Sequence, residues 1–317
     1  MNKSSSHIYG PVPSRRLGKS LGVNNIPHKV CSYSCIYCQI GKALTLQSER
    51  QEFYQPRALA NEVKAMLCNI QNNEEYPDYI CIVPDGEPAL DINLGELIDQ
   101  LKQINIPVAV ITNASLITMP EVRNDLLQTD YVSVKIDTVD EKIWKKINIP
   151  HKQLKLSEIL HGIETFSKEF IGKLVSETML VKGVNDSSGQ LAQTANFIAR
   201  INPDIAYISV PTRPPAFDDV EVPDSNRVNE AWHIFKNYLK SVELLTGYEG
   251  NAFSSTGNFT DDILSITAVH PMREDAVQQL LSKANTDRSV LDTLVEQQVI
   301  IKNIYNGNTF YLRKFNK

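Results

Sequence analysis

Short apolar runs alternate with amphipathic segments along the first 210 residues of the chain. Near-continuous runs of Val, Ile and Leu, a few residues long, are typical of strands that are buried on both faces. Six such runs predict the inner strands of a sheet: "SLGVNNI" (20–26), "YICIV" (79–83), "VAVIT" (108–112), "YVSVKI" (131–136), "LVSETMLV" (174–181) and "AYISV" (206–210).

The segments between these runs have helical periodicity. In residues 58–70 the apolar side chains of Leu59, Val63 and Leu67 recur on one face of a helix. Parallel neighbouring strands need a crossover connection, which is usually a helix. The alternation of strands and helices therefore predicts a mainly parallel sheet. We therefore predict an α/β fold, either a partial (βα)6 barrel or an open doubly wound sheet, with ligands at the C-terminal ends of the strands. The other predicted helices cover residues 94–104, 157–170, 188–201 and 225–239.

The pattern changes after a polar stretch at residues 251–260. Three short helical patterns follow, and residues 299–314 then alternate around Asn306-Gly307, which is a strong hairpin turn. Three helices and a hairpin resemble a winged helix. We predict a core domain over residues 1–250, a linker over 251–260 and a small winged-helix-like domain over 261–317.

The distribution of charge argues against a protein that binds DNA sequence-specifically. The formal net charge is -5, whereas general nucleic-acid binding needs clustered Lys and Arg. The third C-terminal helix, which would enter a major groove, carries Asp287, Asp292 and Glu296. By contrast, residues 1–48 contain Lys and Arg but no acidic residue. These N-terminal cations either offset a bound anionic group or attract a phosphate-bearing substrate.

Three of the five cysteines, Cys31, Cys35 and Cys38, are clustered, and we interpret the isolated Cys68 and Cys81 as packing residues. The sequence has no signal-like apolar start and no apolar run of about 18 residues, so we expect a cytoplasmic protein that does not span a membrane. Thiols stay reduced in that compartment.

A structural zinc site needs four ligands, and His28 could complete one together with the three clustered cysteines. The C-x3-C-x2-C spacing also permits three thiolates to hold a [4Fe-4S] cluster with one open iron.

The cysteine segment resembles the radical S-adenosylmethionine (radical SAM) superfamily, whose hallmark is C-x3-C-x-aromatic-C, with Tyr37 at the aromatic position. "PDGEPAL" (84–90) is similar to the Gly-Gly-Glu-Pro motif of that superfamily, with Asp85 in place of the first Gly. The resemblance implies a partial (βα)6 radical SAM barrel as the fold and SAM as a cofactor. It also implies that the segment Gly86, Glu87 and Pro88 receives the methionyl ammonium of SAM, through backbone groups and the Glu87 carboxylate.

Further segments are similar to a narrower subfamily that includes the tRNA 4-demethylwyosine (wybutosine) synthases. They are "GPVPSRRLGKSLGVNNIP" (10–27), "ITNAS" (111–115), "SVKID" (133–137), "SETMLVKGVND" (176–186) and "VPTRPPA" (210–216). This resemblance implies cofactor contacts from polar side chains at or just beyond strand ends. The candidates are Asn113, Ser133, Lys135, Glu177 and Lys182.

The resemblance implies an enzyme that uses a [4Fe-4S] cluster to cleave SAM reductively. The 5'-deoxyadenosyl radical so formed would abstract a hydrogen from the substrate. An electron donor such as flavodoxin or ferredoxin is expected, and RNA or a nucleotide is the favoured substrate. The alternatives are an enzyme that modifies a peptide or protein, and a winged-helix regulator that senses redox state through its cluster. No residue is assigned a catalytic role, and the histidines other than His28 are assigned none.

Overall fold

The computed structural model describes residues 7–70, 75–247, 250–251 and 253–314. None of the helices in these ranges is both long enough and apolar enough to cross a membrane.

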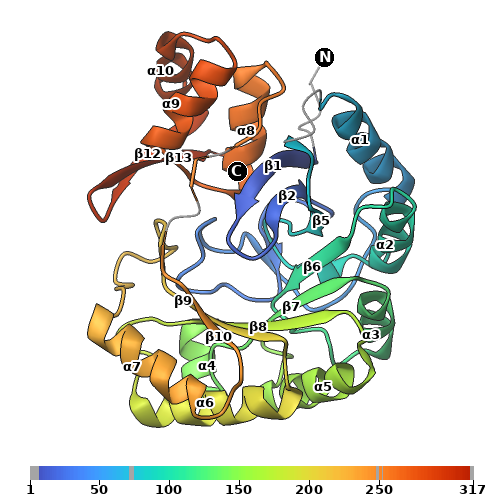
Figure 1. The fold of residues 1–317 in the computed structure, drawn as a ribbon, viewed down its shortest axis with the longest axis vertical. Coiled ribbons are helices and arrows are strands. Elements are labelled where there is room, and N and C mark those ends of the chain that lie inside the picture. The colour runs from blue at the N-terminus through green and yellow to red at the C-terminus, as the bar shows by residue number, and fades with distance from the viewer. Residues whose placement is uncertain (1–6, 71–74, 248–249, 252, 315–317) are drawn as a thin grey trace.

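An eight-stranded, curled sheet forms the centre of the molecule (Figure 1). Its first strand is antiparallel to the second, and every later strand is parallel to its neighbour. Strand order in the sheet follows chain order, as expected for strands joined by crossover helices. The predicted strands are confirmed as β2 and β5 to β9. In order, the strands are β1 (Ile8–Ser14), β2 (Gly18–Val23), β5 (Tyr79–Ile82), β6 (Val108–Thr112), β7 (Tyr131–Lys135), β8 (Lys173–Met179), β9 (Ile205–Ser209) and β10 (Val242–Leu245).

Helices cover the outer face of this sheet, and neighbouring helices contact one another around the curve (Figure 1). The one-sided cover confirms the partial barrel over the open doubly wound sheet. The five predicted helices are confirmed, whereas α3 and α4 were not predicted because both are short and bury few apolar side chains. The helices are α1 (Pro56–Cys68), α2 (Leu94–Lys102), α3 (Pro120–Leu127), α4 (Glu141–Ile147), α5 (Leu156–Glu169), α6 (Ser188–Ile201) and α7 (Ser225–Lys236), with a 3-10 turn η2 (Pro88–Leu90) after β5.

Alternate residues of the central strands pack into two separate apolar layers. Ile80 and Val108 point to the helices and belong to the main core. Cys81, Ala109 and Tyr131 are paired in register on the other face, where they form an inner layer. Burial of one large aliphatic side chain stabilises the fold by about 1.5–3 kcal/mol. The sheet is thus a rigid frame that holds the strand ends in place.

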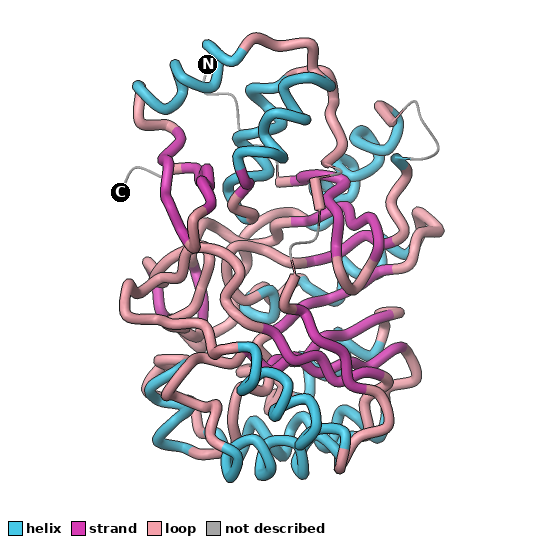
Figure 2. Tube along the Cα trace, turned by 60° about the vertical axis from the view of Figure 1, so that its left-hand side comes forward, coloured by secondary structure: helices cyan, strands magenta, loops and turns pink. Residues whose placement is uncertain are grey.

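The segment after residue 258 packs beside β1 at one end of the molecule (Figures 1 and 2). Tyr9 and Val12 of β1 share an apolar cluster with Phe259 and Ile263. The hairpin turns at Asn306 and Gly307, whose φ angles are 47° and 73°, as in a type I′ turn. The three helices and the hairpin were predicted, while the winged-helix class and the domain boundaries stay predictions. The elements are α8 (Phe259–Val269), β11 (Met272–Arg273), α9 (Glu274–Lys283), α10 (Arg288–Glu296), β12 (Ile300–Tyr305) and β13 (Asn308–Arg313).

Candidate active site

A cavity of about 350 Å³ lies where the C-terminal ends of the parallel strands meet the cysteine segment. Cys31, Cys35 and Cys38 all line it. Cys31 ends β3 (Val30–Cys31), which pairs in parallel with β4 (Thr45–Leu46). The pairing closes the base of a loop over residues 32–44 that carries the other two cysteines. This loop brings the three thiols to one cavity, as their spacing predicts.

Backbone and side-chain hydrogen bonds fix the cysteine loop. The Cys38 amide donates to the Cys35 carbonyl at 3.1 Å, and the Ile36 amide donates to Ile147 at the end of α4 at 2.9 Å. Two side-chain amides donate to sulfur, Asn113 to Cys31 at 3.7 Å and Asn148 to Cys35 at 3.4 Å. Such donors stabilise negative charge on thiolates and tune iron–sulfur clusters.

The thiols fit a cluster better than a single metal ion. Burial raises the pKa of all three thiols, that of Cys35 to about 12, so a bound metal would be needed to keep them as thiolates at neutral pH. Among the residues that the structure describes, no three His, Cys, Asp or Glu side chains gather closely enough to hold one metal ion. A cluster does not require that closeness, because each thiolate binds a different iron. His28, the residue that could complete a zinc site, pairs with Asp85.

The loop after β5 packs directly against the cysteine strand. A Cβ atom added to Gly86 would overlap the Val30 carbonyl oxygen, and the Glu87 amide donates to that oxygen at 3.2 Å. Asp85 is buried and accepts from Asn24 at 3.1 Å in addition to its pairing with His28. Its φ angle is not positive, so Asp fits at the position where the superfamily motif has Gly. The backbone of this loop therefore lies directly against the strand that carries Cys31.

Glu87 lines the cavity as a buried carboxylate held by three donors. Its side chain accepts from Thr112 Oγ1 at 2.6 Å, from the Asn113 amide at 2.8 Å and from the Ala89 amide at 3.0 Å. Burial raises the pKa of Glu87 to about 7, against the opposing effect of these donors. A carboxylate has about four acceptor sites, so one site remains for a donor from the cavity.

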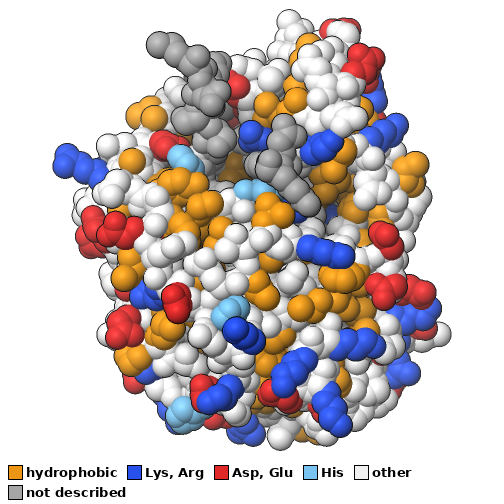
Figure 3. Space-filling model, turned by 180° about the vertical axis from the view of Figure 1, so that it is seen from behind, with side chains coloured by type: hydrophobic (Ala, Val, Ile, Leu, Met, Phe, Trp, Pro, Cys, Tyr) orange, Lys and Arg blue, Asp and Glu red, His pale blue; other side chains and the backbone are white. Residues whose placement is uncertain are grey.

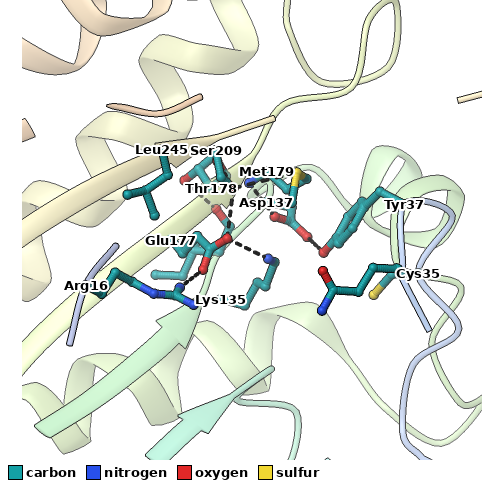
Figure 4. Close-up of polar contacts among 12 residues, drawn as sticks. Arg16, Cys35, Tyr37, Lys135, Asp137, Glu177, Thr178, Met179, Ser209 and Leu245 are labelled. Carbon is teal, nitrogen blue, oxygen red and sulfur yellow. Dashed lines mark hydrogen bonds and ion pairs between the residues drawn. The ribbon is translucent and has the colours of Figure 1, made fainter. Parts of the chain in front are cut away.

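A second carboxylate, Glu177 of β8, has cationic partners (Figure 4). It pairs with Arg16 and with Lys135 Nζ at 3.1 Å, and it accepts from Ser209 Oγ at 2.8 Å. Burial alone would raise the pKa of Glu177, but the two cations outweigh burial and hold this pKa well below its usual range. Glu177 therefore carries a full negative charge at neutral pH and fixes the position of Lys135.

A buried network fixes Tyr37 within the cysteine loop (Figure 4). The Tyr37 hydroxyl donates to Asp137, and Asn148 Nδ2 donates to the same carboxylate at 2.7 Å. The Met179 amide donates to Asp137 at 2.9 Å. Asn148 thus connects Asp137 to Cys35, so the aromatic residue of the motif and the thiol are held by one set of bonds.

The structure brings most of the sequence-predicted residues to the cavity. Three of them do not line it. Pro88 begins η2, Ser133 is buried within β7, and Lys182 pairs with Glu221 at 2.6 Å with its side chain 54% exposed. The predicted residues that line the cavity are Cys31, Cys35, Tyr37, Cys38, Gly86, Glu87, Asn113, Lys135 and Glu177.

Sequence reasoning missed a contact between the C-terminal segment and the cavity. Arg213, in the loop after β9, donates to Gln39 Oε1 at 2.7 Å and to His270 Nε2 at 2.9 Å. Gln39 Nε2 donates to the Val269 carbonyl at 3.1 Å. Burial and the nearby Arg213 and Arg15 hold the pKa of His270 well below its usual range, so its ring is neutral. The only sequence signal that could have placed Arg213 at the cavity is its position in the segment "VPTRPPA". No sequence signal indicated that His270 would lie there.

The cavity lining carries more cations than carboxylates. On the face seen in Figure 3, acidic and basic side chains are interspersed among apolar ones, in keeping with the negative net charge. Five cations, Arg15, Arg16, Lys29, Lys135 and Arg213, line the cavity together with three carboxylates, Asp85, Glu87 and Glu177.

The partial barrel and the three-cysteine cavity define a radical SAM enzyme. The model of the radical SAM superfamily matches residues 25–197, and the chain belongs to that superfamily. Over 307 residues the chain is 43% identical to a UPF0026 protein of Methanocaldococcus jannaschii, a match that covers 96% of this chain and 95% of the relative.

Two further comparisons are more distant. The chain is 26% identical over 240 residues to a probable dual-specificity RNA methyltransferase RlmN of Endomicrobium trichonymphae, covering 72% of this chain and 63% of the relative. A solved structure of TYW1 with a lysine-pyruvate adduct bound has a TM-score of 0.55 and 15% identity, covering 75% of this chain and 78% of that one. At this identity the TYW1 comparison supports the fold alone.

Proposed function

We propose that the chain holds a [4Fe-4S] cluster through Cys31, Cys35 and Cys38 and cleaves SAM reductively to act on RNA or a nucleotide. The observation that carries the proposal is the convergence of three thiols and the Glu87 carboxylate on one cavity. When bound, the cluster supplies one electron to SAM, which gives methionine and a 5'-deoxyadenosyl radical that abstracts a substrate hydrogen. We expect flavodoxin or ferredoxin to supply the electron.

The residues of the chain bind and orient the cofactor. Glu87 uses its remaining acceptor site for the methionyl ammonium, because a charged acceptor in a buried site favours a cationic donor. Lys135 is held by Glu177 and faces the cavity, where its ammonium is placed to bind an anionic or hydroxyl group of SAM. Asn113 donates toward Cys31 and supports the adjoining thiolate. The Tyr37 network keeps the cysteine loop in place.

The strand ends and the cysteine loop also shield the reaction from water. Tyr37 and Glu87 are buried, and the inner layer of the sheet closes the floor of the cavity with apolar side chains. Exclusion of water from a site prevents side reactions of a reactive intermediate. The protein thus supplies position and dryness, while the cofactors supply the chemistry.

Three observations support RNA or a nucleotide as the substrate. The strand-end motifs resemble the wyosine-synthase subfamily. One relative is named as a probable RNA methyltransferase. The cavity lining carries more cations than carboxylates, which favours a phosphate-bearing molecule.

Incubation of the reduced protein with SAM and total RNA under anaerobic conditions, followed by mass spectrometry of the nucleosides, tests the substrate. A nucleoside whose mass changes only when SAM is present supports the proposal. Uncoupled cleavage of SAM with no change in any nucleoside, together with a changed peptide pool, contradicts it.

A further inference from the structure

A groove of about 230 Å³ lies between the cysteine loop and the C-terminal segment. Lys29 and Leu44 form one wall, while Ile301 and Arg313 of the hairpin β12–β13, with Lys314 directly after it, form the other. The two walls come from parts of the chain more than 250 residues apart. The groove therefore exists only because the C-terminal segment packs against the barrel.

The groove adjoins the cysteine cavity. Both are lined by Lys29, Gln39, Ile40 and Val269. Gln39 and Val269 are joined by a hydrogen bond of 3.1 Å, and the hairpin is tied to the barrel by Tyr305, whose hydroxyl donates to the Pro211 carbonyl at 3.2 Å. A long substrate that lies in the groove would therefore reach the edge of the cavity.

The charges of the groove all have one sign. Lys29, Arg313 and Lys314 line it together with His28, and none of the lining residues in the described part of the chain is Asp or Glu. Asp85 lies behind the groove and is bound by His28 and Asn24. One carboxylate is thus set against three cations, and the groove attracts anions although the whole chain is acidic.

Apolar side chains lie between these cations. Leu44 is 56% exposed and Ile301 is 45% exposed, and the two stand on opposite walls. A positively charged groove can follow the backbone of a single strand, and the exposed aliphatic side chains beside the cations offer apolar surface to ribose and base. A duplex keeps its bases stacked in its interior, so their faces cannot reach these side chains. Chemistry on a base also requires an unpaired or flipped nucleotide.

We propose that this groove binds the sugar–phosphate backbone of single-stranded RNA and leads one nucleotide into the cysteine cavity. The inference rests on the proposed function, because it names the site that would hold the RNA substrate. It assigns the C-terminal segment a role in substrate binding through the hairpin, and not through α10, the acidic third helix of the segment.

Binding of a labelled single-stranded RNA of about 12 nucleotides to the full-length protein, measured by fluorescence anisotropy without SAM, tests the groove. Lys314→Glu reverses a charge on its wall, and Arg313→Gln removes a second. Lys302→Glu is the matched control, because Lys302 is exposed on β12 but does not line the groove. We expect Kd to rise about three- to tenfold in each groove variant. The logarithm of the association constant decreases as the logarithm of the salt concentration rises, and the magnitude of this negative slope should be smaller by about 0.7 for each phosphate contact that is lost.

Two further readouts separate the groove from the proposed function. Iron content and uncoupled release of 5'-deoxyadenosine should be unchanged in Lys314→Glu, because Lys314 lies outside the cysteine cavity. If Lys314→Glu and Lys302→Glu bind RNA equally well, the groove is not the RNA site. If an acidic peptide displaces the RNA at the same concentration of charged groups, the groove binds peptides. If the wild-type protein binds RNA but releases no 5'-deoxyadenosine, the groove stands and the proposed function fails.

Discussion

Replacement of Glu87 by Gln tests the proposed cofactor contact most sharply. The change preserves the size of the side chain and removes its charge. Two of the three donors, Thr112 Oγ1 and the Ala89 amide, meet Oε1, and the third, the Asn113 amide, meets Oε2. The variant can therefore keep two of these bonds if the amide oxygen occupies the Oε1 position. The loop should remain folded.

The expected loss of SAM affinity follows from the charged bond. A hydrogen bond to a charged group is worth about 1.5–3 kcal/mol, which raises Kd by roughly one to two decades. Burial raises the pKa of Glu87 to about 7, and only the ionised form pairs with an ammonium. SAM affinity of the wild-type protein should therefore fall as the pH drops through about 7, by up to roughly tenfold per pH unit. In Glu87→Gln this dependence should disappear.

Equilibrium dialysis of labelled SAM against the anaerobic, cluster-loaded protein at pH 6 and pH 7.5 measures both effects. Glu221→Gln is the control, because Glu221 is exposed and pairs with Lys182 outside the cavity. An unchanged Kd in Glu87→Gln at normal iron content would show that Glu87 only holds the loop. An equal pH dependence in the variant would assign the titration to another group.

Three further predictions concern the cysteine segment and its support. Cys31→Ala should abolish a cluster of about four irons per chain, whereas Cys68→Ala should retain it, as iron analysis after anaerobic reconstitution will show. Glu177→Gln leaves two partly buried cations, Arg16 and Lys135, without their carboxylate and should lower the free energy of unfolding by about 1.5–3 kcal/mol in a urea titration. Because the pKa of Glu177 is depressed in the folded protein, its stabilisation is present above the ordinary carboxyl pKa and is lost as the pH falls below it; an unchanged acid transition in Glu177→Gln would refute this. Gly86→Ala should displace the Val30 carbonyl and impair cluster retention, and normal iron content in that variant would contradict the close packing.

The strands of the barrel and the cysteines could be predicted from the sequence because both signals are local. Apolar runs mark strands buried on both faces, and the cysteine spacing lies within eight residues. β1 was missed because "IYGPVPS" contains Gly and two Pro, and β10 because it is only four residues long with two exposed positions. A strand-end pattern also could not tell that Lys182 lies outside the cavity.

The contribution of the C-terminal segment could not be predicted for a different reason. His270 and Gln39 are 231 positions apart in the sequence, and Arg213 joins them only after the segment packs on β1. Such contacts depend on tertiary packing, which leaves no periodic pattern in the sequence. The same holds for the groove between the hairpin and the cysteine loop.

The central claim is that the three cysteines support reductive cleavage of SAM. Its most direct test is the release of 5'-deoxyadenosine after anaerobic reduction of the reconstituted protein with SAM, in the absence of substrate. We predict that the wild-type protein releases 5'-deoxyadenosine and methionine in equal amounts, and that Cys31→Ala releases neither. Absence of 5'-deoxyadenosine from a wild-type protein with full iron content, or equal release from Cys31→Ala, would contradict the account.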